Sequence, residues 1–287
     1  MSKTNRNFKA SVFTHLFRET GKEYELYNAV APGSFPPGTP VEDATLTDVL
    51  YMDRVNDLSF IVGGKLVVFF EHQSTINENM PLRDLMYCGR VYEMIVPKKR
   101  IYTKSRIAIP TPEFYVIYNG AEEFPDKAVY RLSEMYALPP GEEPALELVV
   151  QVYNINPGHN GEVLQRSETL REYMAFITKT RENEANGMNR EEAINKAIHE
   201  CIKEGILAEY LEKYGSEVQS MLCKEWDWDE ARAAWEEEAE ERERAKWEAR
   251  EADKDAAHKA EVADKDAKIA DKDAIIAQLK AQLAVSM

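Results

Sequence analysis

Two apolar runs separated by Gly63-Gly64 constrain the fold of this chain more than any other feature. The run "DLSFIV" ends at position 62, and the run "KLVVFFEHQ" begins at position 65. Both are rich in β-branched and aromatic residues, and a Gly-Gly pair suits the positive φ angles of a tight hairpin turn. We therefore expect two antiparallel strands, with position 62 paired to position 65 and position 57 opposite position 70.

Helical and strand-like patterns alternate on both sides of this hairpin. Apolar residues recur at helical spacing in four stretches, "FKASVFTHLF", "EYELYNAV", "MPLRDLMYCGRVYEMIV" and "GEVLQRSETLREYMAFITKTRE". Three further stretches have the composition of strands, "LTDVLYMD", "EFYVIYNG" and "LELVVQVYNI". We therefore predict an α/β domain over residues 1–187, in which helices flank a mixed sheet.

The chain changes in character twice after this domain. Residues 188–225 carry a helical pattern with one apolar face, whereas residues 226–287 contain 18 acidic and 11 basic side chains. In the second of these segments an apolar residue recurs at every seventh position, at Val262, Ile269, Ile276 and Leu283. This spacing predicts a coiled coil and hence a homo-oligomer. The alternative is a lone charged helix held by pairs of opposite charge one turn apart.

Composition narrows the class of protein. A chain of 287 residues, 44% of them hydrophobic, can bury a core without help from disulfides or metals. It has no run of eighteen apolar residues and no apolar leader, and its three cysteines form no CxxC pair. We therefore expect a cytoplasmic protein with no membrane contact.

The net charge of −15 argues against tight, non-specific binding of nucleic acid. Basic residues are nevertheless concentrated in "PKKR", where Lys98, Lys99 and Arg100 are candidates for a local DNA-binding groove. A solvated loop that follows a helix explains these three residues equally well.

Acidic residues stand at the predicted open end of the hairpin. Asp57 should lie opposite position 70, one residue from Glu71, so a small shift of register or a bulge would bring the two carboxylates together. Two neighbouring carboxylates repel each other unless a cation lies between them. Oxygen ligands of this kind favour Mg²⁺ or Mn²⁺. Acidic residues at strand ends are common, however, and this pattern alone is a weak indication of a metal site.

The same residues carry a resemblance to a known family. Asp57, a hairpin, and Glu71-x-Gln73 at the end of an apolar strand resemble the core of the PD-(D/E)XK nuclease superfamily. The stretch "EHQS" followed by "NMPLR" resembles its recombination-promoting nuclease (Rpn) branch, whose members are also described as transposases. Further similarity lies in "NRNFKASVFTHLF", "YELYNAV", "IPTPEFYVIYNG", "NINPGHN" and "REEAINKAIHECIKEGIL". The resemblance covers residues 5–223 and excludes the predicted coiled coil.

This resemblance implies a restriction-endonuclease-like fold and a metal-dependent DNA endonuclease. Asp57, Glu71 and the main-chain carbonyl of His72 would hold Mg²⁺ or Mn²⁺. An acidic residue on an N-terminal helix often completes such sites, and Glu25 is the first choice here and Glu19 the second. It is equally possible from the sequence that Glu25 is a surface glutamate with no role in the metal site.

One departure from the superfamily pattern concerns catalysis. Gln73 occupies the place of the usual lysine, as expected of this branch. A lysine supplies positive charge beside the attacking water, whereas a glutamine can only orient groups through hydrogen bonds. We therefore expect slow cleavage, or cleavage that depends on a cation supplied by assembly.

The helix after the hairpin offers possible contacts to DNA. Arg83, Tyr87 and Arg90 recur on one face of that helix and could contact phosphate. The alternatives are pairing of the arginines with acidic neighbours and a place for the tyrosine in the core.

A second class of function fits the same sequence. The acidic charge and Gln73 would suit a catalytically degenerate nuclease fold that acts as an assembly or binding protein through its coiled coil. A nuclease acting on RNA is a third reading. In some related families a separately translated C-terminal fragment restrains the nuclease, and Met188 could start such a fragment.

Overall fold

The computed structural model describes residues 11–33, 35, 36, 38–46, 57–72, 77–137, 139, 141–227, 241, 242, 244, 246, 247, 250, 251 and 254. For residues 57 and 70–72 it describes the backbone alone. The chain divides into two compact units, Met1–Glu230 and Ala231–Met287. The described residues of the second unit are helical. The seven-residue repeat that predicts the coiled coil lies outside the described residues.

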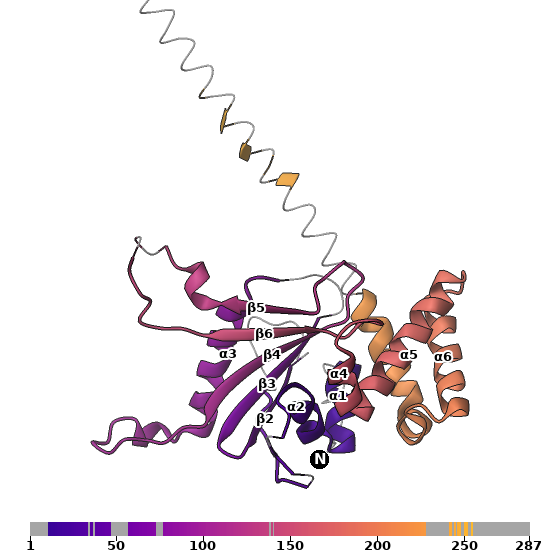
Figure 1. Cartoon of the computed structure of the whole chain (residues 1–287), viewed down its shortest axis with the longest axis horizontal. Coiled ribbons are helices and arrows are strands. Elements are labelled where there is room, and N and C mark those ends of the chain that lie inside the picture. The colour runs from indigo at the N-terminus through magenta and orange to yellow at the C-terminus, as the bar shows by residue number, and fades with distance from the viewer. Residues whose placement is uncertain are drawn as a thin grey trace, which may run out of the picture. The chain divides into compact units, whose positions relative to one another are not determined.

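In the described part of the first unit, six strands form one mixed sheet (Figure 1). Their order across the sheet is β1-β2-β3-β4-β6-β5. The strands are β1 (Glu42–Asp43), β2 (Asp57–Val62), β3 (Lys65–His72), β4 (Thr111–Tyr118), β5 (Lys127–Arg131) and β6 (Val149–Asn154). Strands β3, β4 and β6 run parallel, while β1, β2 and β5 are antiparallel to their neighbours. The predicted mixed sheet is therefore confirmed.

The central hairpin has the register predicted from its turn. Val62 pairs with Lys65, and Asp57 pairs with Phe70. Both turn glycines have positive φ angles, 53° at Gly63 and 79° at Gly64, which residues other than glycine rarely adopt. A Cβ atom at Gly63 would also lie only 2.2 Å from the ring of Phe35. The Gly-Gly pair is thus required both by the turn and by the side chain packed against it.

Helices cover both faces of the sheet, as predicted (Figure 1). They are α1 (Val12–Thr20), α2 (Glu23–Val30), α3 (Met80–Ile95), α4 (Gly161–Arg166), α5 (Glu168–Ala185) and α6 (Arg190–Glu204), with short 3₁₀ turns η2 (Lys98–Arg100) and η3 (Leu132–Met135). A further helical stretch occupies 208–227. Helix α3 packs on one face through Tyr87 and Val91, and the other helices contribute to the core of the opposite face.

The prediction of one long helix from position 161 was wrong. The chain breaks at Ser167, which has an extended backbone (φ −126°, ψ 109°) and separates α4 from α5. The Ser167 hydroxyl accepts a hydrogen bond from the Leu170 amide at 3.1 Å, so it caps the N-terminus of α5. The helical region that follows also breaks, at Gly205 and Leu207, both of which have positive φ angles.

The helices after Asn189 share the core of the sheet domain. Ile194 and Cys201 of α6 are buried in the same cluster as Phe13 of α1. The Glu225 carboxylate accepts a hydrogen bond from the backbone amide of Val12 at 2.7 Å. The segment expected at 188–225 therefore packs within the first unit. In the part of the chain that the structure describes, every helix is too short or too polar to cross a membrane.

Candidate functional site

The hairpin brings the backbones of two predicted site residues close together. Asp57 begins β2, and Glu71 and His72 end β3, the neighbouring strand. Because Asp57 pairs with Phe70, Glu71 lies one residue beyond it on the adjacent strand. The side chains of Asp57, Glu71 and His72, and all of Gln73, lie outside the described residues. The structure thus places the backbones of Asp57, Glu71 and His72 at one end of the sheet.

The pleat of the two strands sets a condition on this site. Leu58 and Phe69 pack in the core beneath α1 and α2, whereas Ser59 faces α3. Residues alternate between the two faces of a regular strand. Position 57 therefore belongs to the same face as Ser59, and position 71 belongs to the same face as Phe69. One ion held by both carboxylates therefore requires a bend or bulge where the strands end, as the sequence already led us to expect.

Tyr87 anchors this hairpin to α3. Its ring is 2% exposed, and its hydroxyl hydrogen-bonds to the Ser59 hydroxyl at 2.8 Å. The same hydroxyl accepts a hydrogen bond from the backbone amide of Leu46 at 3.2 Å. This corrects the expectation that Tyr87 contacts DNA, because a buried ring whose hydroxyl is already bonded is not available at the surface. Tyr87 instead fixes β2 two residues from Asp57.

The two arginines of α3 are half-buried beside this tyrosine. The Arg83 guanidinium donates a hydrogen bond to the Met80 sulfur at 3.6 Å, so part of its length is packed along the helix. Arg90 lies two turns further along α3 and is also partly exposed. Both side chains therefore retain surface from which they could reach a ligand.

Asp84 is an acidic residue of α3 that the sequence analysis did not single out. It is 0% exposed, and its neighbours on α3 include Tyr87 and Cys88. Burial raises the pKa of the Cys88 thiol, and the negative charge of Asp84 raises it further. A fully buried carboxylate is rare in proteins. Asp84 is thus a buried carboxylate on α3, the helix that packs on the face of the sheet to which Ser59 points.

Glu25, the first choice for a third acidic ligand, is bound to the start of α5. One of its oxygens accepts hydrogen bonds from the Ser167 hydroxyl at 2.7 Å and from the Thr169 amide at 3.0 Å. Its other oxygen lies 3.3 Å from the Lys22 ammonium. Burial acts to raise the pKa of Glu25, but these bonds outweigh it and lower the pKa overall. The observed contacts give Glu25 the role of a helix cap.

Glu19, the second choice, is exposed at the end of α1. Its carboxylate accepts a hydrogen bond from the Tyr214 hydroxyl at 2.5 Å. This bond joins α1 to the helical stretch at 208–227. The structure therefore engages both N-terminal glutamates in contacts between helices.

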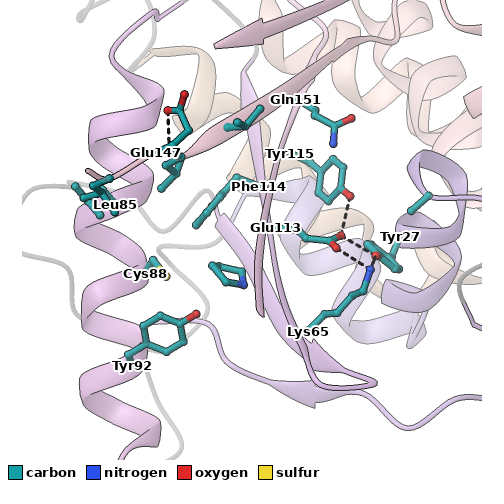
Figure 2. A pocket seen from close by; sticks show the side chains of 15 residues that line it. Tyr27, Lys65, Leu85, Cys88, Tyr92, Glu113, Phe114, Tyr115, Glu147 and Gln151 are labelled. Atoms are coloured by element: carbon teal, nitrogen blue, oxygen red, sulfur yellow. Dashed lines mark hydrogen bonds and ion pairs between the residues drawn. The ribbon is translucent and has the colours of Figure 1, made fainter. Parts of the chain in front are cut away.

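The opposite end of the sheet holds a pocket of about 600 Å³ (Figure 2). It opens where β4 and β6 begin, since the first three residues of β4 pair only with β3. Leu85, Cys88 and Tyr92 of α3 line one side of it, and Tyr27 and Lys65 line the other. Sequence reasoning did not anticipate this pocket, because its walls come from segments far apart in the chain.

A network centred on Glu113 occupies one wall of the pocket (Figure 2). Its carboxylate lies 2.7 Å from the Lys65 ammonium and accepts hydrogen bonds from Tyr27 at 2.7 Å and Tyr115 at 2.9 Å. Lys65 also donates to the Tyr27 hydroxyl at 2.8 Å. The charges of this network are paired within it, so its evident role is to join β3, β4 and α2.

The pKa shifts agree with this pairing. Burial acts to raise the pKa of Glu113, but the bonds from Lys65, Tyr27 and Tyr115 outweigh it and lower the pKa. Hydrogen bonds to Glu113 and Tyr27 raise the pKa of Lys65. Burial raises the pKa values of Tyr27 and Tyr115. At neutral pH the network therefore contains one carboxylate, one ammonium and two neutral phenols.

The remaining DNA-binding candidates are exposed. Lys98, Lys99 and Arg100 form the 3₁₀ turn η2, in the loop that follows α3. This loop leaves α3 at the end near the pocket, because α3 runs back along the sheet from the end of β3 to the start of β4. The basic residues therefore lie at the opposite end of the sheet from Asp57 and Glu71.

Among the described side chains, no group of three histidine, cysteine, aspartate or glutamate residues is arranged to hold a metal ion. The side chains of the expected ligands Asp57, Glu71 and His72 lie outside the described residues. Comparison of the chain with protein-family models, curated proteins and solved structures finds no match.

Proposed function

We propose that the chain is a metal-dependent DNA endonuclease whose active site lies at the open end of the β2–β3 hairpin. The observation that supports this most is the register of the hairpin, which pairs Asp57 with Phe70 and leaves Glu71 next to it. The mixed sheet with helices on both faces is consistent with the resemblance to PD-(D/E)XK nucleases.

The donor groups proposed for the site suit a hard divalent ion. Asp57, Glu71 and the main-chain carbonyl of His72 offer only oxygen, which Mg²⁺ and Mn²⁺ prefer. When bound, such an ion activates water and stabilises the charge that develops on a phosphodiester. The backbone adjacency of the two strand ends fits this donor set, subject to the bend required by the pleat.

The protein's own residues have three further tasks in this proposal. Gln73 orients the attacking water by hydrogen bonds, without the positive charge that a lysine would bring. Tyr87 holds β2 against α3 through Ser59 and so keeps Asp57 in place. Arg83 and Arg90 approach the phosphates of the substrate from α3.

The tail and the helical segment add assembly and regulation to the proposal. A coiled coil over the C-terminal repeat would join chains, so that two sites could address both strands of a duplex. A fragment that begins at Met188 would contain α6 and the helix at 208–227, both of which pack on the core. Such a fragment could compete with its counterpart in the intact chain. Recombination, mobile elements or phage defence are the contexts that the resemblance implies.

Cleavage of supercoiled plasmid DNA tests the proposal. Wild-type protein with Mg²⁺ or Mn²⁺ should nick or linearise the plasmid, and EDTA should abolish the reaction. Asp57→Ala and Glu71→Ala should each lose at least a hundredfold of the rate, because each removes a ligand. Glu212→Gln serves as a matched control, since it removes one exposed carboxylate from the helical stretch at 208–227 of the same unit.

Two outcomes would contradict the proposal. Equal rates in wild type and in both variants would place the activity elsewhere or in a contaminant. No cleavage by any of the proteins, with single-stranded DNA and RNA also tried, would favour the degenerate fold that acts as an assembly protein.

A further inference from the structure

An exposed arm, residues 97–110, connects α3 to β4 and projects from the body of the first unit (Figure 1). All ten residues from 97 to 106 are exposed. The base of the arm is fixed, because the Tyr92 hydroxyl donates a hydrogen bond to the Pro110 carbonyl at 2.7 Å. The arm is therefore a surface feature with a defined attachment.

The arm is strongly basic in an acidic protein. Between positions 94 and 112 there is no acidic residue, whereas the chain as a whole has a net charge of −15. The five cations of the arm are Lys98, Lys99, Arg100, Lys104 and Arg106. None of their side chains forms an ion pair with another residue in the described part of the chain, unlike Lys65 or Arg166. This charge is thus available to an external anion.

The tip of the arm is apolar and aromatic. Ile101 is 57% exposed and Tyr102 is 89% exposed, the highest exposure among the large hydrophobic side chains that the structure describes. The turn beneath them is ordered by hydrogen bonds, from the Arg100 amide to the Pro97 carbonyl at 2.8 Å and from the Thr103 hydroxyl to the Arg100 carbonyl at 2.8 Å. An exposed aromatic ring between cations is the combination that binds nucleic acid by stacking and by phosphate contact.

We propose that this arm is a DNA-binding element, in which the cations contact phosphates and Tyr102 stacks on a base. The choice of DNA over other polyanions rests on the proposed function. The arm deepens that function by placing a substrate contact at the opposite end of the sheet from the carboxylates. DNA offers phosphates to the cations of the arm and base faces to its aromatic ring, whereas a simple anion would use the charge alone.

The position of the arm sets the scale of the complex. Strand β3 has eight residues, whose seven steps of about 3.3 Å separate its two ends by roughly 23 Å. A duplex that reached from the carboxylates to the arm would extend over about seven base pairs at 3.4 Å each. Cleavage close to the end of a duplex should therefore gain nothing from the arm.

Binding of labelled oligonucleotides in EDTA, followed by fluorescence anisotropy, tests the arm without any need for cleavage. Lys98→Gln/Lys99→Gln/Arg100→Gln should bind a twenty-base-pair duplex at least tenfold more weakly than the wild type. It should also make the fall of log K with log salt less steep. The magnitude of the slope should drop by about two to three, since each lost phosphate contact removes about 0.9 from it. The matched control is Lys196→Gln/Lys203→Gln/Lys213→Gln, which neutralises three exposed lysines on the helices after Asn189 and should change the affinity less than twofold.

The aromatic tip is tested by Tyr102→Ala. Loss of one stacked base should weaken binding of a single-stranded twenty-mer about tenfold and leave the salt slope unchanged. The residue is 89% exposed, so the variant should fold as the wild type does, with the same thermal unfolding curve.

Equal affinity of the arm variants and the wild type for both oligonucleotides would overturn the inference. So would an arm-dependent binding to phosphatidylserine vesicles that is stronger than binding to DNA, because the arm would then recognise an anionic lipid surface. Plasmid cleavage with no effect of the arm variants on DNA binding would leave the proposed function intact and remove the arm from it. Arm-dependent DNA binding without any cleavage would support the arm as a DNA-binding element and contradict the proposed nuclease function.

Discussion

The two ends of the central sheet use acidic residues in different ways. At the pocket end, Glu113 lies among one ammonium and two phenols, and its charge is balanced by side chains of the same chain. At the hairpin end, the backbones of Asp57 and Glu71 lie one residue apart in register on adjacent strands. The contacts of Glu113 stabilise the fold, whereas the proposed function gives the two strand-end carboxylates to a divalent cation. The comparison therefore assigns a stabilising role to Glu113, and the proposed function places the chemistry at the other end of the sheet.

Removal of the Glu113 carboxylate should give the largest change in stability. In Glu113→Leu, Lys65, Tyr27 and Tyr115 lose the acceptor that they share, which should lower the free energy of unfolding by about 2 kcal/mol. Urea denaturation measures this change. Lys65→Met should lose about half as much, because the Lys65 side chain is 37% exposed. A lower cleavage rate in Glu113→Leu protein that is still folded would contradict the assignment of Glu113 to stability alone.

The same carboxylate predicts a dependence of stability on pH. Since the folded protein lowers the pKa of Glu113, its contribution is present above the pKa of free glutamate and is lost as the pH falls through the lowered value. The difference in unfolding free energy between wild type and Glu113→Gln should therefore shrink as the pH falls below about 4. A difference that grows toward low pH would contradict the sign of this shift.

Tyr87→Phe should affect both stability and cleavage. Loss of its hydroxyl leaves the Ser59 hydroxyl and the Leu46 amide without a shared partner in a buried place, at a cost of about 1–2 kcal/mol in the free energy of unfolding. Cleavage should also slow severalfold, because Ser59 lies two residues from Asp57. Tyr115→Phe is the matched control at the pocket end and should change stability alone. Equal effects of the two variants on the rate would remove the distinction.

Gln73→Lys should raise the cleavage rate about tenfold, which corresponds to 1.4 kcal/mol in the barrier. The lysine would place positive charge beside the attacking water and the scissile phosphate. Single-turnover rates on a labelled duplex give the measurement, with Gln73→Met as the uncharged control of similar length. No gain in Gln73→Lys would mean that position 73 is not beside the reacting phosphate.

Glu25→Gln should give the smallest change, a loss of about 1 kcal/mol in the free energy of unfolding. The carboxylate accepts hydrogen bonds at the start of α5, where negative charge is favourable. Its lowered pKa means that this contribution is present near neutral pH and fades in acid. Ser167→Ala is the matching variant on the other side of the contact. A large drop in cleavage rate without a change in stability would return Glu25 to the metal site.

Local signals account for the parts of the fold that the sequence predicted correctly. The hairpin register followed from Gly63-Gly64, because both glycines take positive φ angles that fix a two-residue turn. The strands β4 and β6 and the helix α3 followed in the same way from their apolar patterns. Each of these elements is specified by residues within a few positions of one another.

The missed features depend on contacts between distant segments. The break at Ser167 was not predicted because Leu170 stands where a capping box would have a glutamate, and Glu25 of α2 supplies the carboxylate instead. The short edge strand β5 was missed because it is only five residues long and carries Lys127 and Arg131 at its ends.

The candidate site divides in the same way into residues that local signals predicted and residues that depend on contacts between distant segments. Its two strand-end acids were identified by local pattern and by resemblance, while the burial of Tyr87 and Asp84 depends on how α3 packs against the sheet. The Glu113 network joins residues 48 positions apart, Lys65 and Glu113, which only the parallel pairing of β3 with β4 brings together.

Binding of Mn²⁺ to the intact protein tests the central claim most directly, because it asks whether the two strand-end carboxylates hold a divalent ion. Titration calorimetry of wild-type protein should show one site per chain, and Asp57→Asn and Glu71→Gln should each weaken it at least tenfold. Glu113→Gln, which removes a paired carboxylate at the other end of the sheet, should bind Mn²⁺ as the wild type does. Undiminished binding in both Asp57→Asn and Glu71→Gln would contradict the account.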